Sequence, residues 1–215
     1  MSKLHTGWSR HTTVVDGRPA RGRVSDSLVT RVLPGSSLLS GAALSKDAIL
    51  SALRISSVVH ISCHGCPNRD SPLLARLEVE GASRFSVWAH EIRDLDLSHI
   101  DLVVLAACRS SSGIHDSVAS LTHQFLLAGC RMAIGAPVDI EDRATTMMFL
   151  WFYEALLAVD DPAIALARAQ AECRRSPDPR LADPSCWSRF QLLQQSAFSC
   201  NSRGVPYDLH PLCGV

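Results

Sequence analysis

Hydrophobic and polar residues follow two different periods along most of the chain. Three segments centred on runs of Val, Ile, Leu, Met or Ala have the length of strands that are buried on both faces, at 56–62, 101–107 and 130–138. Before, between and after them, apolar residues recur at helical spacing, at 45–55, 116–129, 142–159 and 162–175. This alternation predicts an α/β sandwich with a mostly parallel sheet and right-handed crossovers.

Local signals place the ends of several predicted elements. Ser45 is a candidate N-cap, Gly129 stands where a helix would end, and Pro162 suits the first turn of the helix that follows it. Three further elements have weaker patterns: an exposed strand, a short helix capped by Ser86, and an edge strand, at 73–81, from 86 onward and at 185–193.

Residues 1–26 have no sustained apolar period and are rich in Arg, Gly, Ser and Thr. This composition is typical of a loose leader or the remnant of an upstream region, so we expect these residues to lie outside the core. The predicted domain organisation is a leader at 1–26, a single globular domain at 27–198 and a tail at 199–215.

Composition narrows the class of protein. The 215 residues can bury a core without metal or disulfide support, and 21 basic residues balance 21 acidic ones. Because the net charge is zero, no global field attracts nucleic acid or a membrane surface, and we expect neither as a partner. The most apolar run, 145–159, is shorter than the roughly 20 residues that span a bilayer. Eight scattered cysteines without a signal peptide indicate reduced thiols in a cytoplasmic protein.

The stretch "SCHGCPNRD" contains the spacing C-x-x-C, at Cys63 and Cys66. A zinc site would need two more ligands, and the chain has no second C-x-x-C. His60 and His64 are four residues apart, but on a predicted strand this separation does not suggest a shared ligand set. A thioredoxin-type redox site would begin a helix, whereas Pro67 and Asn68 favour a loop. We therefore interpret Cys63 as a buried strand residue and Cys66 as an exposed loop thiol, and His60 as a packed histidine.

The residue between those cysteines has a stronger interpretation. His64 follows one predicted buried strand and Cys108 follows another, and reactive groups in α/β sheets collect at the carboxyl ends of strands. An imidazole within reach of a thiol can take its proton and make it a nucleophile. The backbone N–H groups at Gly65 and Cys108 could stabilise an oxyanion. This pattern predicts a cysteine–histidine dyad.

An acidic cluster, Asp139, Glu141 and Asp142, follows the strand predicted at 130–138. It could line the same cleft and bind a basic substrate side chain. The simpler interpretation for Asp142 is an ordinary helix N-cap, which leaves Asp139 as the better candidate for substrate binding.

The segments "SVVHISCHG", "DLVVLAACRSSSG" and "GCRMAIGAPVDIEDRATT" occur in an order that resembles the CHAT domain family. These are caspase-like cysteine peptidases, related to separases, that often follow tetratricopeptide repeats. The resemblance covers about residues 28 to 196. It implies a caspase-like three-layer α/β/α sandwich in which His64 is the general base, Cys108 is the nucleophile and Gly65 flanks the oxyanion hole. Arg109 stands where the family usually has an acidic residue, so Arg109 joins Asp139 as a candidate for substrate selection.

Two functions from different classes follow. The first is a cysteine endopeptidase that hydrolyses peptide bonds in a protein or peptide substrate and needs no metal or organic cofactor. Its expected partners also include a tetratricopeptide-repeat region or another regulatory region. The second is a catalytically silent CHAT-like scaffold or regulatory interaction domain. The intact pair of His64 and Cys108 favours the enzyme.

Overall fold

The computed structural model describes residues 8, 11–18, 27–68, 71–81, 83–106, 117–136 and 142–195. Within these residues the main sheet has six strands in the order β2-β1-β3-β7-β8-β9. Neighbouring strands are parallel, except that β9 runs antiparallel to β8 at one edge. The strands are β1 (Thr12–Asp16), β2 (Ser37–Ser40), β3 (Val58–Ser62), β7 (Leu102–Leu105), β8 (Met132–Gly135) and β9 (Gln191–Gln194).

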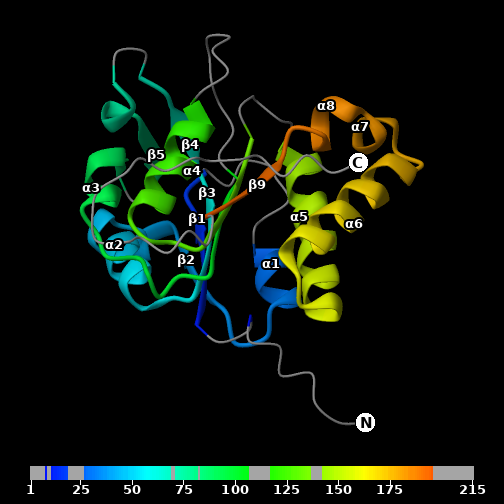
Figure 1. Ribbon diagram of the computed structural model, residues 1–215, viewed down its shortest axis with the longest axis horizontal. Coiled ribbons are helices and arrows are strands. Elements are labelled where there is room, and N and C mark those ends of the chain that lie inside the picture. The colour runs from blue at the N-terminus through cyan, green and yellow to red at the C-terminus, as the bar shows by residue number, and fades with distance from the viewer. Residues whose placement is uncertain are drawn as a thin grey trace.

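Helices cover both faces of the main sheet, so the molecule has three layers (Figure 1). On one face lie α2 (Lys46–Ile55), α3 (Ala89–Arg93) and α4 (Ser117–Leu127). On the other lie α1 (Ser27–Val32), α5 (Asp142–Val159) and α6 (Pro162–Arg175), with the short helices α7 (Pro179–Ala182) and α8 (Pro184–Trp187) after them. The predicted α/β/α sandwich with a mostly parallel sheet is confirmed. None of the described helices is both long and apolar enough to cross a bilayer.

Each central strand supplies side chains to two hydrophobic cores, because successive strand residues point to opposite faces. Val14 and Val58 pack in the core that contains α5 and α6. Their neighbours Val15 and Val59 pack in the core beneath α2, α3 and α4. The three predicted strands, β3, β7 and β8, are buried along their whole length, as the sequence indicated.

A smaller antiparallel sheet begins directly after β3. It contains β4 (His64–Cys66), β5 (Arg76–Glu80) and β6 (Arg84–Trp88), in that order within the described part of the chain. Leu77, Val79 and Val87 point inward and join the core on the α2 side. The strand expected at 73–81 is present, but it belongs to this second sheet. The 3-10 helices η2 (Gly41–Ala43) and η3 (Pro72–Leu74) lie in the connections before α2 and β5.

Several predicted helix ends are confirmed. The Ser45 hydroxyl accepts a hydrogen bond from the Ala48 N–H at 3.1 Å, and this caps α2. Gly129 follows α4 with a φ of 108°, a conformation that side chains rarely adopt. Pro162 opens α6, where Asp161 caps the first turn with 2.8 Å and 3.0 Å bonds to the Ala163 and Ile164 N–H groups.

The expectation that residues 1–26 lie outside the core is wrong for Thr12–Asp16. These residues form β1, which pairs with β2 on one side and β3 on the other. The segment looked too polar because it contains two threonines. Both are buried, and the Thr13 hydroxyl bonds to the hydroxyls of Ser37 and Ser56 at 3.1 Å and 2.8 Å. Mutual hydrogen bonds thus allow a polar strand to occupy a position next to the centre of the sheet.

Two weaker expectations need smaller corrections, and one helix was not expected. Residues 27–32 form α1, which the sequence pattern did not indicate. Ser86 lies inside β6 and caps nothing; α3 begins instead at Ala89, where the Glu91 carboxylate accepts a 2.9 Å bond from the Trp88 N–H. The predicted edge strand is present only at Gln191–Gln194, because 184–187 are helical.

His60 is buried in a network of polar side chains on β3 and its neighbours, so the interpretation of His60 as a packed histidine is confirmed. The His60 ring is 1% exposed, with Nδ1 3.1 Å from the Tyr153 hydroxyl and Nε2 3.3 Å from Ser62 Oγ. Arg18 donates a 3.0 Å hydrogen bond to the same Ser62 oxygen. Burial, aided by the nearby Arg18 charge, lowers the pKa of His60 to about 3, so the imidazole is neutral in the folded protein.

This network makes stability depend on pH. In the unfolded chain His60 has its ordinary pKa of 6.5, so between about pH 6.5 and 3 only the unfolded state binds this proton. Above pH 6.5 His60 is neutral in both states and costs the folded state no stability. Below pH 6.5, we expect His60 to lower the free energy of unfolding by roughly 1.4 kcal/mol for each pH unit. Urea unfolding of the wild type and His60→Gln, over that range, measures the difference in slope. Equal slopes in the two proteins would contradict the burial of a neutral imidazole.

The position of β1 leads to a second expectation. A chain that begins at Ser27 loses Val14 and Val15 from the two cores and leaves β2 and β3 without their shared neighbour. We expect this chain to show no cooperative thermal transition, whereas a chain that begins at Trp8 melts like the full-length protein. Circular dichroism melting curves measure both. A cooperative transition in the shorter chain would instead support the expectation that residues 1–26 lie outside the core.

Candidate functional site

His64 lies where the two sheets meet. The chain leaves the main sheet at Ser62, passes through the buried Cys63 and enters β4 at His64. The side chain of His64 is half-buried, and Glu78 of β5 is its direct partner across the antiparallel ladder. The expectation that His64 follows the carboxyl end of a central strand is therefore confirmed, and the residue also has a fixed neighbour in a second sheet.

A tight backbone contact holds this junction in place. The Gly17 N–H donates to the Ser62 carbonyl at 2.7 Å, and the Gly17 carbonyl accepts from the Glu80 N–H at 2.8 Å. A Cβ atom at Gly17 would lie 2.8 Å from Val79 Cγ1 and 3.1 Å from the Ser62 carbonyl oxygen, so a side chain does not fit. Residues just after β1 thus connect the end of β3 to the small sheet two residues before His64.

Gly65 occupies the middle of β4, opposite Leu77. The Ala89 N–H donates to the Ala75 carbonyl at 2.8 Å, which shows that odd-numbered positions of β5 bond toward β6. Even-numbered positions bond toward the other side, because hydrogen bonding alternates along an antiparallel strand. Gly65 faces an odd-numbered position, so its backbone N–H and C=O point away from β5 and toward the outer edge of the small sheet.

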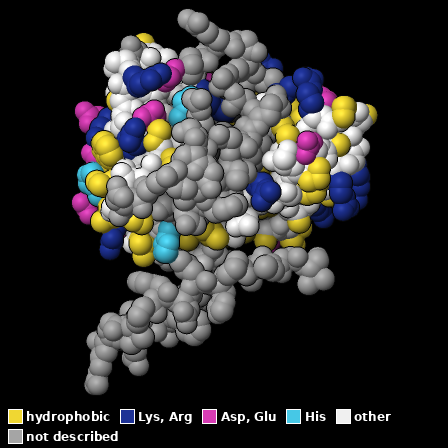
Figure 2. Space-filling view, turned by 90° about the horizontal axis from the view of Figure 1, so that it is seen from above, with side chains coloured by type: hydrophobic (Ala, Val, Ile, Leu, Met, Phe, Trp, Pro, Cys, Tyr) yellow, Lys and Arg dark blue, Asp and Glu magenta, His cyan; other side chains and the backbone are white. Residues whose placement is uncertain are grey.

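The exposed side of the small sheet, which we call the outer face, consists of the side chains that alternate with the buried ones. Its cross-strand rows contain His64, Glu78 and Ser86; Cys66, Arg76 and Trp88; and Glu80 with Arg84. Basic and acidic side chains lie close together on the left of Figure 2, on the side where Figure 1 places the small sheet.

Arg76 organises the outer face. Its Nη2 and Nε atoms donate to Glu78 Oε1 at 2.7 Å and 3.1 Å, and its guanidinium carbon lies 5.3 Å from the centre of the Trp88 ring. The hydrogen bond from Arg76 lowers the pKa of Glu78 below its ordinary value, and the Cys66 thiol also bonds to this carboxylate. Glu78 is therefore ionised at neutral pH, at the position across from His64.

Cys63 and Cys66 have different surroundings, although they are three residues apart. Cys63 is fully buried in the core beneath α2, α3 and α4, as predicted. Cys66 is half-buried on the outer face, but it lies in β4 and not in a loop. Neither is in a disulfide, and no cluster of three or more metal-ligating side chains occurs among the described residues.

The other predicted site residues, Cys108, Arg109 and Asp139, lie outside the described residues. The strand that leads to Cys108 is β7, which is parallel and adjacent to β3, with Leu105 level with Ile61. Ala106 is the last described residue of this segment and is buried. Only residue 107 separates it from Cys108 in the sequence.

Sequence reasoning missed the part of the site that β5 supplies. The alternation of 73–81 predicted a strand, and Glu78 was on its polar side. Its pairing with β4 is a long-range contact that no local pattern gives. Arg18 was missed for a different reason, because it belongs to the stretch that lacked an apolar period.

The sequence profile of the CHAT domain matches residues 19–195, which is most of the chain. The protein belongs to the CHAT domain family. No curated protein sequence matches this CHAT domain significantly. The predicted family membership is thus confirmed, and with it the expectation of a caspase-like α/β/α fold.

Solved structures of similar fold include the Arg-specific cysteine proteinase gingipain R, with a TM-score of 0.51 and 13% sequence identity. The match covers 86% of the CHAT domain chain and 46% of the gingipain chain. A complex of the RgpB pro- and mature domains from Porphyromonas gingivalis matches with the same TM-score, 12% identity and coverage of 86% and 47%. The chain therefore spans about half the length of these structures, and at this identity the likeness shows a shared fold.

Proposed function

We propose that this CHAT domain is a cysteine endopeptidase in which His64 is the general base and Cys108 is the nucleophile. The observation that carries the proposal is the place of His64 at the carboxyl end of β3, beside the carboxyl end of β7. Because Cys108 follows β7 by three residues, the two sequence segments that carry the dyad start from neighbouring strand ends.

The proposed chemistry has two halves. In the first, the Cys108 thiol gives its proton to His64, the thiolate attacks the substrate carbonyl carbon, and a tetrahedral oxyanion forms. Collapse of this intermediate breaks the C–N bond, and His64 returns the proton to the leaving amine. In the second, His64 takes a proton from water and the hydroxide attacks the thioester carbon. Collapse of this intermediate breaks the C–S bond, His64 returns the proton to the Cys108 sulfur, and the acid product leaves. No metal or organic cofactor is used.

The backbone of Gly65 supports a role in this scheme. Its N–H points toward the outer edge of the small sheet, where it can donate to a developing oxyanion beside His64. We propose that the Cys108 N–H is the second donor. Arg109 and Asp139 are the proposed substrate-contacting side chains. The substrate is a protein or peptide, the location is the cytoplasm, and a tetratricopeptide-repeat or other regulatory region is a proposed partner.

A thiol-reactive peptide ketone tests the dyad. We expect selective modification of Cys108, identified by mass spectrometry of peptide fragments, with a rate that falls about a hundredfold in His64→Gln, because the base contributes roughly that much. Cys66→Ser is the matched control, since it removes a neighbouring thiol of the outer face and should leave the rate unchanged. Thermal melting checks that each variant is folded. If Cys108 reacts no faster than Cys66 or Cys213, the proposed dyad is wrong, and a catalytically silent scaffold or regulatory domain becomes the better-supported function.

A peptide library varied at the residue before the cleaved bond tests substrate selection. We expect cleavage after Lys or Arg, with a preference that falls about tenfold in Asp139→Asn, because a charge-assisted contact is lost. Glu80→Gln, which removes a carboxylate that has no proposed role in substrate binding, is the comparison variant and should keep the preference. Cleavage after Asp or Glu, abolished by Arg109→Gln, would instead assign selection to Arg109.

A further inference from the structure

The outer face places an ionised carboxylate directly across from His64. His64 and Glu78 are opposite residues of the β4–β5 ladder, and side chains at such positions project to the same face with Cβ atoms about 4.5–5.5 Å apart. A glutamate side chain is long enough to reach an imidazole across that gap. The proposed base of the dyad thus has a carboxylate as its fixed cross-strand neighbour.

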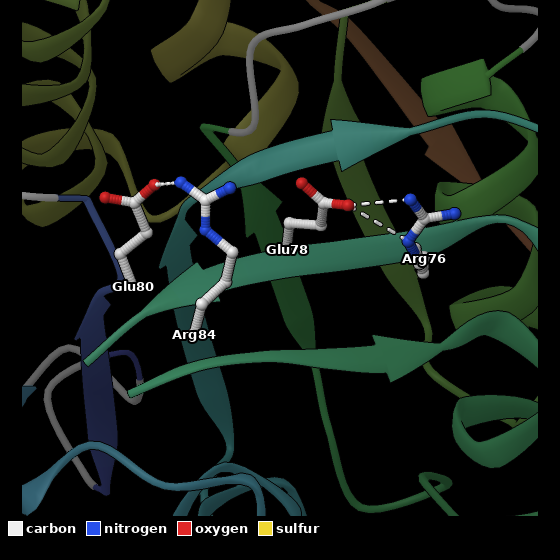
Figure 3. A network of polar contacts seen from close by, with 4 residues as sticks. All are labelled: Arg76, Glu78, Glu80 and Arg84. Atoms are coloured by element: carbon white, nitrogen blue, oxygen red, sulfur yellow. Dashed lines mark hydrogen bonds and ion pairs between the residues drawn. The ribbon is translucent and has the colours of Figure 1, made fainter. Parts of the chain in front are cut away.

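Arg76 holds this carboxylate in its charged form. Both Arg76 contacts end on Oε1 of Glu78 (Figure 3). The guanidinium carbon also lies 5.3 Å from the centre of the Trp88 ring, which helps to hold it in place. The Glu78 side chain is 26% exposed, so water screens the pair and the stability it supplies is small. A residue in this setting contributes little to folding, and its charge remains available to a second cation.

The neighbouring pair on β5 and β6 provides a comparison within the same face. Glu80 forms an ion pair with Arg84, and Figure 3 shows the two pairs along the same sheet. The pairing of β4 with β5 extends only from Arg76 to Glu78, and the Glu80 N–H bonds instead to Gly17. Glu80 therefore resembles Glu78 in residue type, strand and ion pairing, but it has no partner on β4.

We propose that Glu78 is a positioning residue for His64. When the Cys108 proton moves to His64, a thiolate and an imidazolium form with no change in total charge. The Glu78 carboxylate then turns from Arg76 to accept a hydrogen bond from the imidazolium nitrogen that does not face the thiol, and this favours the ion pair. The role of Glu78 rests on the proposed function, because it acts through His64 as the base.

Alkylation of Cys108 by iodoacetamide, a neutral reagent, tests this role in the full-length protein. The rate at neutral pH reports the thiolate fraction, and the ultraviolet thiolate absorbance lost in Cys108→Ser reports it independently. We expect Glu78→Gln to lower both about tenfold, since an opposite charge within 4–6 Å favours a charged group by at least that factor. Glu80→Gln is the matched control and should stay within about twofold of the wild type.

Arg76→Gln separates positioning from a structural role. It breaks the same ion pair as Glu78→Gln but keeps the carboxylate, so we expect it to leave the alkylation rate unchanged or to raise it. Equal losses in Arg76→Gln and Glu78→Gln would show that the ion pair is structural and would overturn the proposal. A wild-type rate in Glu78→Gln, with a large loss in His64→Gln, would overturn it and leave the proposed function intact. A wild-type rate in His64→Gln would overturn both.

Discussion

The contact of Gly17 with Ser62 and Glu80 determines how the two sheets of this CHAT domain meet. One peptide unit donates to the end of β3, and the next accepts from the end of β5. Both strands flank His64, one in sequence and the other across the ladder. The orientation of the proposed base therefore depends on hydrogen bonds made by a segment more than forty residues earlier in the chain. These backbone bonds require a glycine at position 17, because a side chain there would meet Val79 and the Ser62 carbonyl.

Polar groups near the site are of two kinds, which differ in how much they contribute to the stability of the fold. His60, Tyr153, Ser62 and Arg18 form a buried chain in which each member has a partner, and loss of one leaves the others unsatisfied at a cost of roughly 1–3 kcal/mol. The ion pairs of the outer face are partly solvated and contribute about 0–1 kcal/mol each. The first kind makes the strand ends rigid. The second can exchange partners at small cost, which is what a charge that assists a proton transfer needs.

The sequence predicted the layers of the fold because buried strands and amphipathic helices leave local periodic patterns. It placed His64 and Gly65 correctly at the end of β3 for the same reason. β1 was missed because its buried Thr13 is satisfied by long-range hydrogen bonds to the hydroxyls of Ser37 and Ser56, which composition does not reveal. Glu78 was missed because its position opposite His64 depends on the register between β4 and β5. Sequence thus predicts which residues end a strand, whereas cross-strand neighbours require the assembled sheet.

Gly17 also determines the alignment of β1 with its neighbours. A parallel strand that slips by one residue exchanges its two faces, and here Val14 and Val15 would each enter the opposite core. The same slip would bring Asp16 or Arg18 into the space beside Val79 and the Ser62 carbonyl, where no Cβ atom fits. The glycine therefore acts as a steric stop that rejects misaligned pairings while the sheet assembles. A residue without a side chain thereby specifies which of several similar strand alignments becomes the native one.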